Sequence, residues 1–367
     1  MNKVRFISIK GYKSIRQLEK FALNDLNVLV GPNGAGKSNF VSVFKLLNEL
    51  VEERLQTYIQ KSGGGHTFLY YGPKTTSSVE FKFDFDPNAY WCKLIPTGDD
   101  SFIFEEEGCS YLGNRSDGKP YDIPYQQSVL VGDRRESGLN KVHGRIISHV
   151  VESIRSWQIY HFHDTSNTAG IKQIGKIDDN RQLRANASNL AAFLYLLKNK
   201  NDQEYQIIVR AIRLVAPFFG DFNLHPLEQN RDLIRLEWKH KASDEYFDAT
   251  SLSDGTLRFM CLAALLLQPA IKFPTTILLD EPELGLHPHA ITILAKMLKS
   301  ASRKTQIIVS TQSTTLINQL NPEDLIVVDR DQEQSTFRRL TAKDTQNWMD
   351  EFGLGDLWEK NLFGGTP

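Results

Sequence analysis

The chain contains a short apolar strand, a glycine-rich loop and an amphipathic helix in direct succession. Residues 26–30 read Leu-Asn-Val-Leu-Val, residues 31–38 read Gly-Pro-Asn-Gly-Ala-Gly-Lys-Ser, and apolar side chains recur at helical spacing over 39–50. This order turns several backbone N–H groups and the positive end of the helix dipole toward one point. It predicts a loop that binds a nucleoside triphosphate, in which Lys37 reaches the β- and γ-phosphates and Ser38 is a ligand of Mg²⁺. The residues expected to contact the nucleotide are Gly31, Pro32, Asn33, Gly34, Ala35, Gly36, Lys37, Ser38 and Asn39.

A pair of carboxylates follows another apolar strand much later in the chain. Residues 276–279, Thr-Ile-Leu-Leu, are followed by Asp280 and Glu281. Beside a phosphate-binding loop, Asp280 is expected to hold Mg²⁺ through water and Glu281 to act as general base toward the γ-phosphate. A solvent-facing turn set by Pro282 would also explain the pair, but the loop upstream favours the nucleotide interpretation.

A third phosphate-binding candidate precedes the apolar helix expected over 259–267. Ser253, Asp254 and Gly255 offer a hydroxyl and free N–H groups at the start of this helix. Taken alone, the same residues are explained more simply by Ser253 capping the helix.

The remaining pattern predicts an α/β fold with three sequence segments. Short apolar strands at 276–279, 306–310 and 325–328 alternate with helices, which is typical of a parallel sheet covered on both faces. We expect the N-terminal part of an ATPase core over 1–135, with a β-hairpin subdomain and a flexible loop at 62–78. An inserted, mainly helical lobe over 136–250 and the C-terminal part of the core over 251–367 would follow. Within the loop, exposed aromatic side chains are candidate partner contacts: Phe68, Tyr70 and Tyr71.

Composition limits the cellular setting. The formal net charge of −1 supplies no general attraction for nucleic acid or membranes. The three cysteines lack the spacing of a metal site, and their odd number suits a reducing cytosol. The densest apolar stretch is too short to cross a bilayer. We therefore expect a cytoplasmic protein. Two basic clusters, within 134–145 and 172–184, are interpreted as solvated surface, with nucleic-acid contact as the alternative. The run His161-Phe162-His163-Asp164 is interpreted as a polar strand end, with a metal site as the alternative.

The order of these motifs resembles that of ATP-binding-cassette (ABC) ATPases. The chain is similar to the SMC/RecF-like heads, and more closely to the AAA-family ATPases related to the overcoming-lysogenization-defect (OLD) proteins. The residues that carry the resemblance are 31–39, Leu-Ser-Asp-Gly at 252–255, Leu-Asp-Glu-Pro-Glu-Leu-Gly-Leu-His-Pro at 279–288 and the closing run 352–358. The resemblance implies a P-loop NTPase of ABC type, with a mixed central sheet, helices on both faces, an antiparallel hairpin subdomain and an inserted helical lobe.

The resemblance also implies a mechanism in which two copies sandwich two ATP molecules. Each Mg·ATP would lie between Lys37, Ser38, Asp280 and Glu281 of one copy and Ser253, Asp254 and Gly255 of the other. His287 falls in the loop that contacts both subunits, although it could equally just start the next helix. Gln312 stands where transporter-type members often have His, so slow turnover is expected because an amide cannot carry a proton. The Gln that senses Mg²⁺ is not assigned; the candidates are Gln126, Gln127 and Gln158.

The partners expected from the resemblance are a second copy of the chain, with a higher oligomer left open, and a separate effector. That effector would be a nuclease in anti-phage defence or DNA maintenance, because no nuclease-type acidic cluster follows Arg330. One alternative is a DNA-binding SMC/RecF-like repair ATPase. A transporter ATPase subunit is disfavoured by the hairpin-rich insertion and by Gln312.

Overall fold

The computed structural model describes residues 3–111, 113, 125–129, 134–346, 348 and 351–365. The chain divides into two compact units. Unit 1 comprises Met1–Gln158, Pro322–Asn347 and Trp358–Pro367, and unit 2 comprises Ile159–Asn321 and Trp348–Leu357. These boundaries differ from the three segments expected from the sequence, because the end of the chain contributes to both units.

Unit 1 contains an antiparallel sheet with the strand order β2-β1-β4-β5-β6-β7. Most of its strands alternate buried and exposed residues, as a sheet with one solvated face requires. The hairpin prediction is therefore confirmed. The strands are β1 Phe6–Tyr12, β2 Ile15–Ala22, β4 Val79–Phe85, β5 Asn88–Pro96, β6 Phe102–Tyr111 and β7 Tyr125–Ser128.

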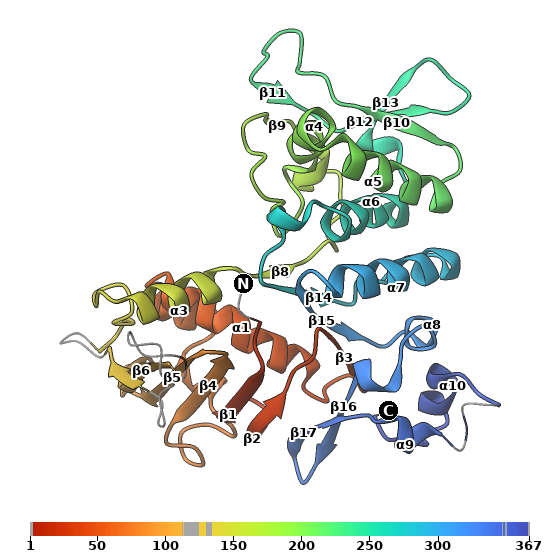
Figure 1. Ribbon diagram of the computed structural model, residues 1–367. Helices are drawn as coiled ribbons and strands as arrows, with labels where there is room; N and C mark the ends of the chain where they lie inside the picture. Colours follow the sequence, from red (N-terminus) through yellow and green to blue (C-terminus); the bar gives the residue numbers. More distant parts are fainter. Residues whose placement is uncertain are drawn as a thin grey trace. The chain divides into compact units, whose positions relative to one another are not determined.

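Helix α1, Lys37–Val51, lies beside α3, Arg145–Arg155, in unit 1 (Figure 1). The ring of Phe44 on α1 contacts Phe83 of β4 and Trp157 at edge-to-face angles, with centroids 5.6 and 5.2 Å apart. Because such pairs add to the burial of apolar surface, they fix the helix that follows the phosphate loop on the sheet. Helix α2, Leu55–Lys61, continues the chain.

Strand β3, Leu26–Val30, is buried at all five residues and precedes the phosphate loop. It pairs in parallel with β16, Leu325–Asp331, which pairs antiparallel with β17, Gln334–Arg339. A mixed sheet was predicted from the sequence, and these pairings confirm it. Short helices α9, Ala342–Thr345, and α10, Leu354–Glu359, follow.

The glycine-rich segment 62–78 differs from expectation in its aromatic residues. It begins with a 3-10 helix, η1 Gly65–Phe68, and the His66 ring contacts the Asp100 carboxylate at 2.7 Å. Phe68 and Tyr70 are buried, whereas Tyr71 is 51% exposed. The prediction of three exposed aromatic side chains was wrong for the first two, because the turn at Asp100 anchors the segment and folds them inward.

Unit 2 carries four helices of three to four turns that pack on one another, α5 on α4 and α6, and α7 on α6 (Figure 1). The segment from 233 to 238 contributes to two strands that belong to different sheets. Its elements are α4 Leu190–Lys200, α5 Asp202–Val215, α6 Asp254–Leu266, α7 Pro288–Ser302, α8 Thr314–Ile317, β10 Phe219–Asn223, β12 Glu237–His240, β13 Tyr246–Asp248, β14 Thr276–Asp280 and β15 Gln306–Thr311, with β8 Trp157–Tyr160 at its start and a small pair, β9 Gly175–Lys176 and β11 Leu233–Ile234.

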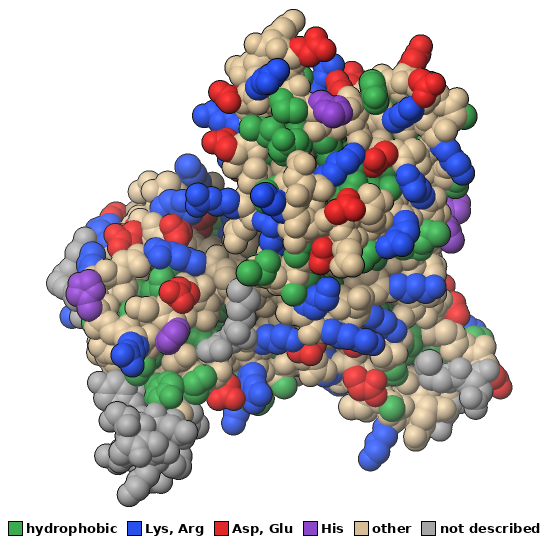
Figure 2. Space-filling view, turned by 45° about the horizontal axis from the view of Figure 1, so that its top comes forward, with side chains coloured by type: hydrophobic (Ala, Val, Ile, Leu, Met, Phe, Trp, Pro, Cys, Tyr) green, Lys and Arg blue, Asp and Glu red, His purple; other side chains and the backbone are tan. Residues whose placement is uncertain are grey.

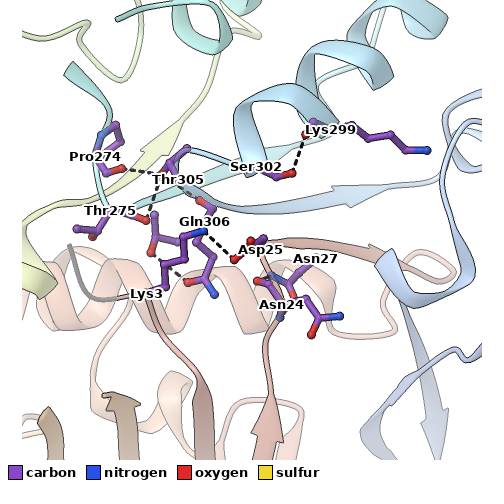
Figure 3. Close-up of polar contacts among 11 residues, drawn as sticks. Lys3, Asn24, Asp25, Asn27, Pro274, Thr275, Lys299, Ser302, Thr305 and Gln306 are labelled. Carbon is purple, nitrogen blue, oxygen red and sulfur yellow. Dashed lines mark hydrogen bonds and ion pairs between the residues drawn. The ribbon is translucent and has the colours of Figure 1, made fainter. Parts of the chain in front are cut away.

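Strands β14 and β15 are parallel, and the hydroxyl of Thr305, just before β15, joins the residues that precede the two strands. Thr305 Oγ1 lies 2.6 Å from the carbonyl oxygen of Pro274 and 3.1 Å from that of Thr275 (Figure 3). Thr276 then faces Gln306, and at the other end Asp280 faces Ser310. The register therefore brings the end of β14 beside the end of β15, where the predicted catalytic residues lie.

Candidate functional site

The phosphate loop connects β3 to α1 in unit 1. Lys37, the first residue of α1, turns back over the loop, and its Nζ lies 2.6 Å from the carbonyl oxygen of Gly31 and 2.9 Å from that of Pro32. The lysine side chain is buried, whereas Ser38, Asn33 and Gly34 are exposed. A lysine ammonium group held at the loop carbonyls, next to an exposed hydroxyl at the start of a helix, fits the pattern of a phosphate-binding loop.

Gly36 caps the start of α1 with a left-handed backbone, φ 117°. A Cβ at this position would lie 2.1 Å from Ser335 Oγ and 2.9 Å from Ser14 Oγ, so only glycine fits. The Ser335 hydroxyl hydrogen-bonds the carbonyl of Ala35 and, at 2.7 Å, Ser14 Oγ. Asn39 Nδ2 donates to the same Ser14 oxygen over 2.7 Å. Ser14 and Ser335 therefore support the loop, a role that no spacing in the sequence indicated.

The carboxylate pair lies at the end of β14 in unit 2. The Ser310 hydroxyl donates to the Asp280 carboxylate, and the Glu281 N–H donates to the Ser310 carbonyl over 2.9 Å. Glu281 adopts φ 42°, an uncommon backbone conformation for a residue other than glycine. Gln312 Nε2 lies 3.3 Å from Glu281 Oε1. The structure thus brings the predicted base and the predicted switch amide together.

The Ser-x-Gly motif stands at the start of α6, as predicted. Ser253 is exposed, and its Oγ accepts a hydrogen bond from the Thr256 N–H over 3.2 Å, so it caps the helix. A Cβ on Gly255 would lie 2.5 Å from the carbonyl oxygen of Gly285, so the helix start approaches the loop after β14 at backbone distance. Ser253 and Asp254 are both exposed to solvent, where a ligand can reach them.

His287 caps α7. Its Nδ1 lies 3.3 Å from the backbone N–H of His289, and Pro288 occupies the first helical position. The helix-start interpretation of this residue is therefore confirmed, and contact with a second copy stays a prediction.

The His161–Asp164 run reaches the carboxylate strand through one of its histidines. His163 Nε2 lies 3.0 Å from the carbonyl oxygen of Asp280. Arg258 on α6 donates to the His163 carbonyl and to the Leu284 carbonyl, each over 2.8 Å. Neither contact was expected from the sequence, in which the two alternating histidines indicated a polar strand end or, as the alternative, a metal site. Within the described part of the chain, no three His, Cys, Asp or Glu side chains are grouped as metal ligands.

The three candidate glutamines lie on two strands. Gln126 and Gln127 are on β7, the edge strand of the antiparallel sheet. Gln158 is on β8 and donates to the Arg155 carbonyl over 3.3 Å. The assignment of a sensing glutamine stays a prediction.

Three basic side chains of the two candidate clusters have partners within the protein. Arg135 contacts Asp99 at 3.0 Å, Arg184 contacts Asp179 at 2.7 Å, and Lys172 donates to the Thr165 carbonyl over 2.6 Å. On the face shown in Figure 2, Lys and Arg side chains stand among Asp and Glu side chains. These contacts favour the solvated-surface interpretation.

Comparison with known structures and families identifies the fold. No curated protein matches the chain. The crystal structure of an Smc head bound to the C-winged helix domain of ScpA has 14% identity and a TM-score of 0.59, and the match covers 94% of this chain and 99% of that one. An Smc head domain with an extended coiled coil, bound to the C-terminal domain of ScpA from Pyrococcus furiosus, has 14% identity and a TM-score of 0.55, with 96% and 99% covered. The predicted P-loop fold of ABC-ATPase type is thereby confirmed.

The described residues include no helix that is both long and apolar enough to cross a membrane. A family model described as "AAA domain, putative AbiEii toxin, Type IV TA system" matches residues 26–318, which is well over half of the chain. The chain therefore belongs to this family of AAA domains and has the fold of an SMC/RecF-like ATPase head.

Proposed function

We propose that the protein binds Mg·ATP, hydrolyses it and uses the cycle to control a second polypeptide. The observation that carries the proposal is the phosphate loop. Lys37 is folded over the loop carbonyls, and Ser38 is exposed at the N-terminus of a 15-residue helix. A buried lysine is costly unless its charge is hydrogen-bonded. Here two carbonyl groups of the loop stabilise the charge, so the side chain is held at the loop and does not fill the apolar core.

The sequence motifs assign a role to each residue of the reaction. Lys37 would neutralise the β- and γ-phosphates, Glu281 would polarise the attacking water, and Gln312 would hold Glu281 or the water in place. Ser38 and Asp280 supply a hydroxyl and a carboxylate, the oxygen donors that Mg²⁺ prefers, so the residues present fit this ion. Bound Mg²⁺ would neutralise charge that develops on the phosphate oxygens.

We further propose that ATP joins two copies of the chain. In this arrangement Ser253 and Gly255 of one copy bind the γ-phosphate held by the other, with Asp254 and His287 at the same contact. The exposure of Ser253 and of Leu284, at 49%, supports the proposal, since both side chains are accessible to a second copy. Hydrolysis removes the shared anion, and the pair separates.

The effector would be a separate cytosolic protein. Its proposed class is a nuclease of an anti-phage or DNA-maintenance system, as the resemblance to the OLD-related ATPases implies. The family description, which names a toxin of a type IV toxin–antitoxin system, supports a role in such a system. A DNA-binding repair ATPase is the second candidate, supported by the fold shared with Smc heads.

The proposal is tested by phosphate release and nucleotide binding on the purified full chain. We expect Mg²⁺-dependent release of phosphate from ATP that stops with EDTA, and a rise in molar mass with ATP in light scattering. Failure to bind ATP by calorimetry would overturn the proposal. DNA binding that strengthens with ATP and weakens steeply with salt would favour the repair candidate.

A further inference from the structure

A buried carboxylate of unit 2, that of Glu283, contacts the chain segment that carries Gln312. Glu283 comes two residues after Glu281, in the turn between β14 and α7, and only 9% of it is exposed. Buried carboxylates are rare in proteins unless they are paired or hydrogen-bonded, so this position needs a reason.

The carboxylate of Glu283 holds the chain just after β15. The Thr311 hydroxyl donates to Glu283 Oε1, and the Gln312 backbone N–H hydrogen-bonds the same carboxylate. The Ser313 N–H in turn donates to Thr311 Oγ1 over 3.0 Å. Among the described residues, Glu283 Oε2 has no hydrogen-bond partner. The contacts of Glu283 therefore converge on the turn that carries Gln312.

Gln312 connects this turn to Glu281. Its side-chain Nε2 lies 3.3 Å from Glu281 Oε1, while its backbone is held by Glu283. Burial, with a smaller contribution from the charge of Glu281, raises the pKa of the Glu283 carboxyl. The two acidic groups are thus coupled through both the amide and their charges.

We propose that Glu283 is a positioning residue for the hydrolysis step: it fixes Thr311 and Gln312 so that the Gln312 amide holds the Glu281 carboxylate ready for the attacking water. This inference rests on the proposed ATPase function. Glu283 does not touch the nucleotide in this scheme, so its loss lowers turnover and leaves ATP binding unchanged.

Two substitutions separate the contacts of Glu283. Glu283→Ala removes the acceptor of the Thr311 hydrogen bond. We expect kcat to fall about tenfold or more and KM to change less than about twofold. The reason is that a well-oriented general base stabilises the transition state and does not affect the binding of ATP. Thr311→Val removes only the hydroxyl and should lower kcat in the same way. Glu283→Gln keeps an acceptor for Thr311, and it should retain most of the wild-type kcat.

The double variant provides the decisive comparison. If Glu283 acts through Thr311 and Gln312, the double variant Glu283→Ala/Thr311→Val should lose little more kcat than either single variant. Circular dichroism and thermal unfolding identify variants that fail to fold; if Glu283→Ala is one of them, Thr311→Val and Glu283→Gln still test the scheme.

The outcomes distinguish this inference from the proposed function. Wild-type protein that does not hydrolyse ATP overturns both. Active wild type together with folded Glu283→Ala or Thr311→Val protein that keeps wild-type kcat overturns the positioning role alone, as does a rise in KM at constant kcat in these two variants.

Discussion

The imidazole Nε2 of His163 lies 3.0 Å from the carbonyl oxygen of Asp280, at the end of the strand that carries the predicted metal ligand. Arg258 binds the His163 carbonyl and the Leu284 carbonyl, so three segments far apart in the sequence meet at this strand end. Hydrogen bonds therefore connect α6, the loop after β14 and the His161–Asp164 run within unit 2.

Replacing His163 with Ala removes a donor to the Asp280 carbonyl. We expect a loss of about 1 kcal/mol in the free energy of unfolding, the usual contribution of one hydrogen bond. Turnover should fall several-fold, because Asp280 loses a backbone restraint. Urea unfolding and phosphate release measure the two effects, with His161→Ala, an exposed histidine of the same run, as the matched control.

Lys37→Ala should abolish tight ATP binding. The lysine supplies the positive side chain of the phosphate loop, and loss of about 2.7 kcal/mol corresponds to a hundredfold weaker dissociation constant. Calorimetric titration with ATP measures it, and Lys61→Ala, at the exposed end of α2, is the control. An unchanged affinity in Lys37→Ala would show that the loop does not bind the nucleotide.

Glu281→Gln should keep ATP affinity while hydrolysis falls by about 10² to 10⁴, the range of general base catalysis. Because the γ-phosphate then persists, the ATP-dependent pair should live longer and appear as a dimer in light scattering. Glu245→Gln, an exposed residue of the same unit, should behave as wild type. A monomer at saturating ATP in Glu281→Gln would contradict the clamp.

Substitutions of Ser253 separate helix capping from phosphate binding. Ser253→Asp retains a good N-cap, so stability should change by less than about 0.5 kcal/mol. Its negative charge would repel the γ-phosphate, and ATP-dependent dimerisation should be lost. Ser253→Asn, a neutral cap, should dimerise more nearly as wild type. Equal dimerisation of the Asp and Asn variants would exclude contact between this residue and phosphate.

The buried Glu107 of unit 1 predicts a pH dependence of stability. It accepts hydrogen bonds from Tyr90 Oη at 2.8 Å, Ser137 Oγ at 2.6 Å and the Gly138 N–H at 2.7 Å, and burial raises the pKa of its carboxyl. The folded state therefore binds the proton more tightly than the unfolded state. This contribution to stability is complete at pH values below the ordinary carboxyl pKa and is lost as the pH rises through the folded-state pKa.

Glu107→Gln tests this dependence because the amide does not ionise. The NH₂ group of the glutamine faces one of the three hydrogen-bond donors that surround Glu107, and that donor loses its acceptor. The variant should therefore have a free energy of unfolding lower than that of the wild type by about 1–3 kcal/mol. The difference between wild type and variant should shrink from pH 5 to pH 8, as measured by urea unfolding. A difference that grows over this range would contradict the raised pKa.

The local part of the site could be predicted from the sequence. The strand at Leu26–Val30, the loop that ends at Lys37 and the helix after it lie as expected, and so does the strand that ends at Asp280. Each depends on residues adjacent in the chain, where hydrophobic period and loop chemistry act over a few residues.

The supporting contacts could not be predicted, because they join residues that are distant in the sequence. Ser335 supports Gly36 from 299 residues away, and the split of 233–238 between two sheets depends on which strands are available to pair. Likewise, Phe68 and Tyr70 are buried because Asp100 anchors their segment, which no local pattern encodes.

The sequence by itself determined the phosphate loop, the carboxylate pair and the start of α6 capped by Ser253, since short-range geometry fixes each of them. Only the tertiary structure decided that Glu283 is buried against Thr311, that Gln312 reaches Glu281 and that His163 holds Asp280. The reason is physical: the register between β14 and β15 and the packing of α6 bring these side chains together, and both arise from contacts made across the fold.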